Sequence, residues 1–189
     1  MAIFDYVMVL ASIIIGLSIT HLLQGLARIV YQSGWSHIYW VHVLWVISLL
    51  EIAIFWWWWE FALSGTHVWT FGLYIFVLGF AAVVYFLAAL LIPTSLEGYN
   101  GYKDYYYTRR FWLLGLYILF CLFDTVDTLL KGADYFANLG WQYPVTVGLQ
   151  CSLCVAGMMW RKEWLHAAIP IVALLINTTA AIQNVHAAT

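Results

Sequence analysis

Six long apolar stretches follow one another along this chain, and they constrain its fold more than any other feature. A helix that crosses a hydrocarbon core of about 30 Å needs roughly 20 predominantly apolar residues. We place such helices at about residues 4–30, 39–61, 69–92, 110–130, 141–160 and 164–185. None shows the strict alternation that a membrane β-barrel needs, and backbone groups in lipid must pair internally. The sequence predicts an all-α membrane protein, a single domain over residues 1–189 with about six transmembrane helices.

Composition supports this class and excludes others. Only 8% of the 189 residues are charged and 65% are hydrophobic, whereas a soluble domain carries about 25% charged residues. A soluble enzyme, a disordered chain and a nucleic-acid binder are therefore poor fits, and we expect no nucleic-acid partner. The chain has no phosphate-binding Gly-rich loop, H-E-x-x-H or G-x-S-x-G motif. We favour a role other than catalysis.

The positive residues predict an orientation. With six crossings, the first, third and fifth loops share one side of the membrane. Six of the seven Lys and Arg residues border these loops: Arg28, Lys103, Arg109, Arg110, Arg161 and Lys162. Positive loops are retained in the cytoplasm, so both termini are expected outside, in the periplasm of a bacterium. The first stretch lacks the basic start of a signal peptide and is too long for one, so we expect it to be retained.

Ionisable residues inside predicted helices are the first candidates for function. Glu51 and Asp124 lie near the middle of the second and fourth helices, Asp127 lies one turn further, and His21 lies in the first. A charge at the bilayer centre costs about 2.5–3.5 kcal/mol, so such groups face the bundle interior, pair or become neutral. We name these four as an ion pathway. For Asp127 the spacing favours a structural ion pair with Lys131, four residues on, and for Glu51 and Asp124 both interpretations stay open.

Aromatic and basic residues mark the expected membrane surfaces. The third loop, about residues 93–108, and the start of the fourth helix combine Tyr and Arg side chains suited to lipid headgroups and phosphates, or to a protein partner. The second helix contains a run of four consecutive tryptophans. Consecutive helical residues point about 100° apart, so the four indoles surround the helix axis, and we interpret the run as an aromatic collar at the membrane surface. A ligand cage is the alternative. These contact candidates are Tyr105, Tyr106, Tyr107, Arg109, Arg110, Trp56, Trp57, Trp58 and Trp59.

No cofactor is expected, although two weak alternatives exist. Cys121, Cys151 and Cys154 could converge with His21 on a soft metal. An apolar environment disfavours the thiolate that metal binding needs, so buried hydrophobic packing is the better interpretation. Haem needs two histidines at matched depth on facing helices, and His21 with His42 is the least poor pair.

Three segments together resemble a family of small multi-pass bacterial inner-membrane proteins to which no activity is assigned. They are FDYVMVLASIIIGLSITHLLQGLARIV, YWVHVLW with FWWWWEF, and YYYTRRFW. The resemblance covers about the first two thirds of the chain. It implies a multi-pass protein of the bacterial inner membrane and brings no ligand or catalytic residue.

Two functional hypotheses of different classes follow. The first is a proton or small-cation channel or transporter, oligomeric in the membrane, that uses Glu51, Asp124 and His21. The second is a non-catalytic accessory or scaffold subunit of a larger membrane complex, whose polar cluster would be sealed by pairing. Membrane lipids are expected partners under both hypotheses.

Overall fold

The computed structural model describes residues 3–32, 39–65 and 69–187, and in these parts every regular element is a helix. Two elements are short: the 3-10 turn η2 (Phe61–Gly65) and α5 (Ala133–Leu139). The six long helices are α1 (Ile3–Gln32), α2 (Trp40–Glu60), α3 (Phe71–Leu91), α4 (Tyr102–Leu130), α6 (Gln142–Met159) and α7 (Glu163–Ala187). The predicted all-α class is confirmed.

In the described part of the chain, five segments are long and apolar enough to cross a membrane. They are Ile3–Tyr31, Trp40–Gly65, Phe71–Leu91, Tyr102–Leu130 and Glu163–Ile182. The 18-residue helix α6 is not among these five. Several membrane-length apolar helices support a membrane protein, while the expected number of six crossings stays a prediction.

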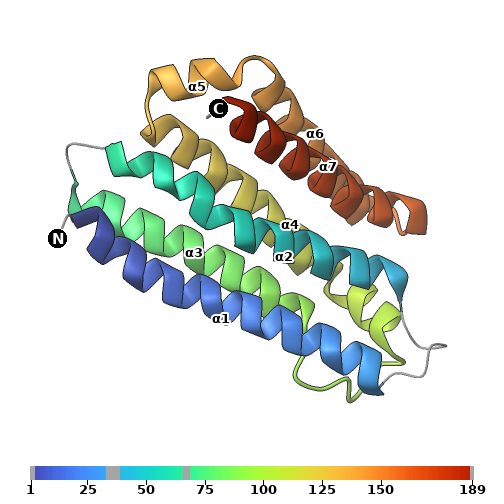
Figure 1. Ribbon diagram of the computed structural model, residues 1–189. Helices are drawn as coiled ribbons and strands as arrows, with labels where there is room; N and C mark the ends of the chain where they lie inside the picture. The colour runs from blue at the N-terminus through green and yellow to red at the C-terminus, as the bar shows by residue number, and fades with distance from the viewer. Residues whose placement is uncertain (1–2, 33–38, 66–68, 188–189) are drawn as a thin grey trace.

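The long helices form a closed ring in the order α1, α3, α4, α6, α7 and α2, and α2 also contacts α3 and α4. Successive long helices run in opposite directions, so α1 begins at the same end of the bundle at which α7 ends (Figure 1). We call this end the termini end. We call the opposite end the basic end, because it carries Arg28, Lys103, Arg109, Arg110, Arg161 and Lys162.

Among the membrane-length helices of the described ranges, α2 has the largest buried share, because its large side chains recur at helical spacing. Trp45, Leu49, Ile52 and Trp56 form one stripe, and each is at most 1% exposed. Spacings of three and four residues place side chains on one face of a helix. This face joins α2 to several of its neighbours.

Helix α1 approaches α3 closely near the basic end. A Cβ atom on Gly25 would lie 2.5 Å from the side chain of Ile92, so only glycine fits without a shift. On the same face of α1, His21 Nε2 bonds to the Ile92 carbonyl at 3.0 Å, and Arg28 donates to the carbonyls of Pro93 and Thr94. The end of a helix leaves carbonyls without intrahelical partners, and α1 supplies donors for this segment.

The start of the fourth helix was predicted wrongly. We expected residue 110 after a loop over residues 93–108, whereas α4 begins at Tyr102. A helix can extend past its apolar stretch into polar sequence, and here buried Tyr105 and Tyr106 anchor the added turns. Helix α5 was not predicted, since seven residues are too few to show a helical pattern.

Candidate functional site

A cavity of about 110 Å³, whose wall mixes apolar and polar side chains, lies between α4, α5, α6 and α7 in the half of the bundle nearer the termini end. We call it the polar cavity, after the polar residues in its wall. Trp59 of α2 also contributes to its wall. Polar residues in the wall come from four segments and include Asp124, Lys131, Tyr143, Gln150 and Asn177. This volume has room for several water molecules, which need polar partners such as these.

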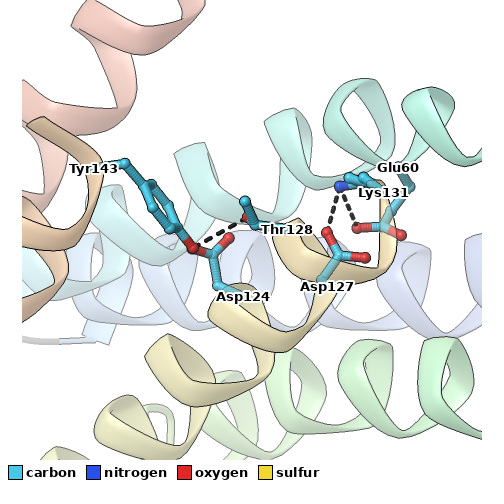
Figure 2. A network of polar contacts seen from close by, with 6 residues as sticks. All are labelled: Glu60, Asp124, Asp127, Thr128, Lys131 and Tyr143. Atoms are coloured by element: carbon cyan, nitrogen blue, oxygen red, sulfur yellow. Dashed lines mark hydrogen bonds and ion pairs between the residues drawn. The ribbon is translucent and has the colours of Figure 1, made fainter. Parts of the chain in front are cut away.

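Asp124 is the carboxylate on the cavity wall. Side chains from both α4 and α6 fix its position. Tyr143 Oη donates to Asp124 Oδ2 at 2.8 Å, while Thr128 Oγ1 donates to the same phenol oxygen at 3.1 Å (Figure 2). Thr128 lies one turn beyond Asp124, so both face α6. One phenol therefore fixes the position of the carboxylate across the helix interface.

A second carboxylate group surrounds Lys131, directly after α4. Lys131 Nζ pairs with Asp127 Oδ2 and lies 3.4 Å from Glu60 Oε1 at the end of α2 (Figure 2). The three side chains are at most 3% exposed. Burial alone lowers the pKa of Lys131, but the two carboxylates outweigh it and raise the pKa overall. The predicted pair of Asp127 with Lys131 is present, with Glu60 as an additional partner.

Charge in this region is not balanced. Glu60, Asp124 and Asp127 supply three carboxyl groups, whereas Lys131 is the one cation in contact with them in the described part of the chain. Glu60 Oε2 and Asp127 Oδ1 are buried without a hydrogen-bond partner. A buried carboxylate without a partner is costly. The cluster can therefore accept further positive charge.

The cavity extends along α4 towards the basic end as far as Tyr117 and Gln150. Tyr117 Oη donates to Gln150 Oε1 at 3.1 Å, and the Cys121 thiol lies 3.5 Å from the same oxygen. Beyond this point the indole of Trp45 packs edge-on against the Tyr117 ring, with centroids 5.2 Å apart. Trp45 is fully buried, and it packs behind Tyr117, which forms the cavity wall on this side.

A separate hydrogen-bond chain begins on the other side of Trp45. Its indole Nε1 donates to Tyr106 Oη at 3.1 Å, and Tyr106 Oη lies 3.0 Å from His166 Nδ1. His166 Nε2 lies 3.1 Å from the Trp160 carbonyl. A carbonyl only accepts, so Nε2 carries the hydrogen and Nδ1 accepts from Tyr106. The indole can only donate, so this chain does not continue through Trp45 to the cavity.

Glu51 lies apart from Asp124. Thr178 Oγ1 of α7 donates to Glu51 Oε1 at 2.5 Å, and Glu51 Oε2 is buried without a partner. No hydrogen bond or ion pair among the described residues joins Glu51 to Asp124. The structure thus separates Glu51 from the other two expected pathway carboxylates. Asp124 and Asp127 lie in one region with Lys131 and Glu60 (Figure 2).

The histidine candidates do not join the cysteine candidates. His21 bonds to the carbonyl of Ile92, whereas His42 is buried against the Tyr102 ring, 4.9 Å between centroids. Cys121 and Cys154 are buried on α4 and α6. In the described ranges no group of three His, Cys, Asp or Glu side chains is arranged to hold a metal ion.

The four consecutive tryptophans face different surroundings, as the helical angle between them requires. Trp56 is buried and packs on Phe80, while Trp57 is half exposed and donates to Ser12 Oγ at 2.7 Å. Trp58 is 60% exposed, and Trp59 lines the cavity. These four indoles enclose no common space.

The tyrosines before the arginine pair differ from the expected headgroup contacts. Tyr105 and Tyr106 are buried, and Tyr105 Oη donates to the Leu90 carbonyl at 2.6 Å. Tyr107 is partly buried and accepts from Tyr39 at 3.3 Å. Arg110 is also buried, whereas Arg109 is exposed. Of the basic pair, Arg109 is therefore the side chain free to meet lipid.

Sequence reasoning missed Glu60 and Tyr143 as members of the site. Glu60 follows the tryptophan run, which hides it in an aromatic segment, and it lies 71 residues before Lys131. One signal was available: Lys131 is the only cation outside the basic loops, and a lone intramembrane cation needs acidic partners. Tyr143 had no comparable signal.

Comparisons of the chain with protein-family models, with curated proteins and with solved structures gave no match.

Proposed function

We propose that this protein exchanges protons at the buried acidic cluster and that it acts as a proton channel or transporter. The observation that carries the proposal is the excess of carboxyl groups over cations beside a polar cavity. Asp124 is the exchanging group, because it alone of the three carboxyl groups lines the cavity. Glu60, Asp127 and Lys131 form the fixed charges around it.

A proton suits this site better than a small cation. The ammonium of Lys131 also lines the cavity, and at short range it repels a second cation in a medium of low dielectric constant. A proton neutralises one carboxylate by forming a covalent O–H bond and needs no shell of oxygen ligands. Tyr143 can stay hydrogen-bonded to Asp124 in both states of the carboxyl group, and Thr128 holds the Tyr143 phenol in place.

Transport across the whole bundle requires Trp45 to move. The cavity serves the half of the bundle nearer the termini end, and the chain from Tyr106 to His166 serves the other half. An indole has no acceptor and cannot relay a proton. Rotation of the Trp45 side chain, with water in its place, would join the two halves.

Location and orientation belong to the same proposal. Six crossings, with α6 as the one before α7, place the start of α1 and the end of α7 on one side. The six cations at the basic end favour a cytoplasmic location for that end, which leaves the termini end in the periplasm. The resemblance noted above supports the bacterial inner membrane.

Proton flux into liposomes tests the function. Purified protein is reconstituted with an internal pH dye, and valinomycin with a potassium gradient sets the voltage. We expect flux above that of empty liposomes, and loss of that flux in Asp124→Asn. Asp134→Asn, an identical change at an exposed position of α5, is the matched control and should keep wild-type flux.

The scaffold hypothesis has one observation in its favour. Two of the three carboxyl groups in the cluster are paired with Lys131, and such pairing can serve structure alone. In that case folded protein gives no flux above empty liposomes, and Asp124→Asn changes nothing. Purification from native membranes in a mild detergent would then retain a defined partner subunit.

A further inference from the structure

A second hollow lies on the outside of the bundle between α3 and α4. It has a volume of about 800 Å³ and is lined largely by apolar side chains, among them Phe86, Trp112, Leu116 and Leu119. Small residues contribute on both helices, Ala89 on α3 and Gly115 on α4. This groove is separate from the polar cavity and shares no lining residue with it.

The groove has one polar end. Arg109, about two turns into α4, lines it together with Leu90, next to the last residue of α3. On the α4 side of the groove, Arg109 and Leu119 are ten positions apart, which is about 15 Å along a helix. That length is about half of a hydrocarbon core of about 30 Å. The groove therefore matches the depth of one leaflet.

No acidic side chain among the described residues neutralises the charge of Arg109. Its Nε donates to Tyr99 Oη at 3.1 Å, a neutral partner. Ion pairs among the described residues involve Lys103 and Lys131, and none involves Arg109. The neighbouring Arg110 guanidinium lies over the ring of Phe111, 4.1 Å from its centroid, and adds a second positive charge beside the groove. An anionic group complements this end.

We propose that the groove between α3 and α4 binds one anionic phospholipid. Its phosphate contacts the guanidinium of Arg109, and one acyl chain lies along Phe86, Leu116 and Leu119. Guanidinium groups bind phosphate with paired hydrogen bonds, and an apolar channel of one-leaflet depth accepts an acyl chain. A charged end followed by an apolar length describes a lipid better than a helix of a second copy. This site is independent of proton exchange in the acidic cluster.

Native mass spectrometry of the full chain in a neutral detergent tests the proposal. The protein is offered phosphatidylglycerol or phosphatidylcholine with identical acyl chains. We expect one retained phosphatidylglycerol and weaker retention of phosphatidylcholine. Arg109→Gln should lower retention of phosphatidylglycerol about fivefold, the factor for one basic contact at a membrane surface. Lys162→Gln, at an exposed cation of the basic end outside the groove, should leave retention unchanged.

A second variant tests the apolar part of the groove. Ala89→Leu fills the wall and keeps every charge, so it should displace the lipid while the unfolding temperature without lipid stays at the wild-type value. Equal retention of the two lipids, or unchanged retention in Arg109→Gln, would overturn the proposal. A dimer that excludes lipid from the groove would overturn it as well, in favour of a second copy as the occupant.

Discussion

Lys131 holds two helices together through its charge. It pairs with Asp127 of its own helix and with Glu60 of α2, and all three side chains are nearly inaccessible. Removing one member of a buried ion cluster leaves unpaired charge behind, which is far more costly than losing an exposed pair. Lys131 is therefore the most important residue of this cluster for stability, since it is the shared ion-pair partner of both carboxylates.

Substituting Lys131 by methionine should lower the free energy of unfolding by about 3–5 kcal/mol. The physical reason is the pair of carboxylates left facing each other without a counterion. Lys103→Met is the matched control, because Lys103 is 59% exposed in its pair with Glu163, and such a pair contributes about 0–1 kcal/mol. Unfolding in mixed micelles followed by circular dichroism gives both values. Equal effects of the two substitutions would contradict a structural role for the cluster.

Local spacing made one part of this site predictable. The four-residue separation of Asp127 and Lys131 indicated their ion pair, because such residues lie on one face of a helix. Glu60 could not be found in this way, since its contact depends on how α2 crosses α4. Tyr143 as the partner of Asp124 depends likewise on the packing of α6 against α4.

The packing of α1 against α3 gives contacts to one sequence-predicted candidate, His21, and to Arg28. His21 was a candidate for ion transport and metal binding, and it bonds to a backbone carbonyl at the end of α3. Arg28 bonds to the next two carbonyls. Between them, Gly25 lets Ile92 approach the backbone of α1. These contacts place the end of α3 and hence the start of the connection to α4.

Gly25→Ala should destabilise the protein by about 1–3 kcal/mol, because the added methyl group overlaps the Ile92 side chain. Gly16→Ala on the same helix is the control, since no atom lies within 4 Å of a Cβ placed there. Alanine favours a helix over glycine, so Gly16→Ala should be neutral or slightly stabilising. Unfolding in mixed micelles compares them. A neutral Gly25→Ala would show that the two helices separate easily.

Helix positions were predictable to a few residues wherever apolar sequence and helix coincide. Predicted residues 69–92 and 164–185 agree closely with Phe71–Leu91 and Glu163–Ala187. Helix α4 was the exception, because hydropathy marks the part of a helix inside lipid and not its end. The polar turns from Tyr102 to Arg109 are helical through burial of tyrosines, which a hydropathy pattern cannot show.

Across the whole molecule, the cations separate into two groups. Six lie at the basic end, whereas Lys131 alone lies near the termini end and is buried by acidic partners. Its charge is thus neutralised inside the bundle and does not compete with the six in setting orientation. By the positive-inside rule, this distribution predicts an orientation with the basic end in the cytoplasm.

Thiol labelling of single cysteines tests the orientation and the crossing of α6. Ala133 and Lys162 flank α6 and are exposed. In a variant without the three native cysteines, Ala133→Cys should react with an impermeant maleimide in intact bacterial cells, because the proposed orientation places this position in the periplasm. Lys162→Cys should react only after the cells are opened. Reaction of both from outside would mean that α6 does not cross, and the reverse pattern would mean that the orientation is inverted.

Proton exchange requires a protonatable Asp124 at the polar cavity, and pH-difference infrared spectroscopy in nanodiscs measures this carboxyl group itself. We predict a carboxylic acid C=O band that grows as the pH falls, is lost in Asp124→Asn and is retained in Asp134→Asn. Exchange into D2O should shift the band, since water reaches the cavity. A difference spectrum without a titrating carboxyl band, or one that Asp124→Asn leaves unchanged, would contradict proton exchange at this site.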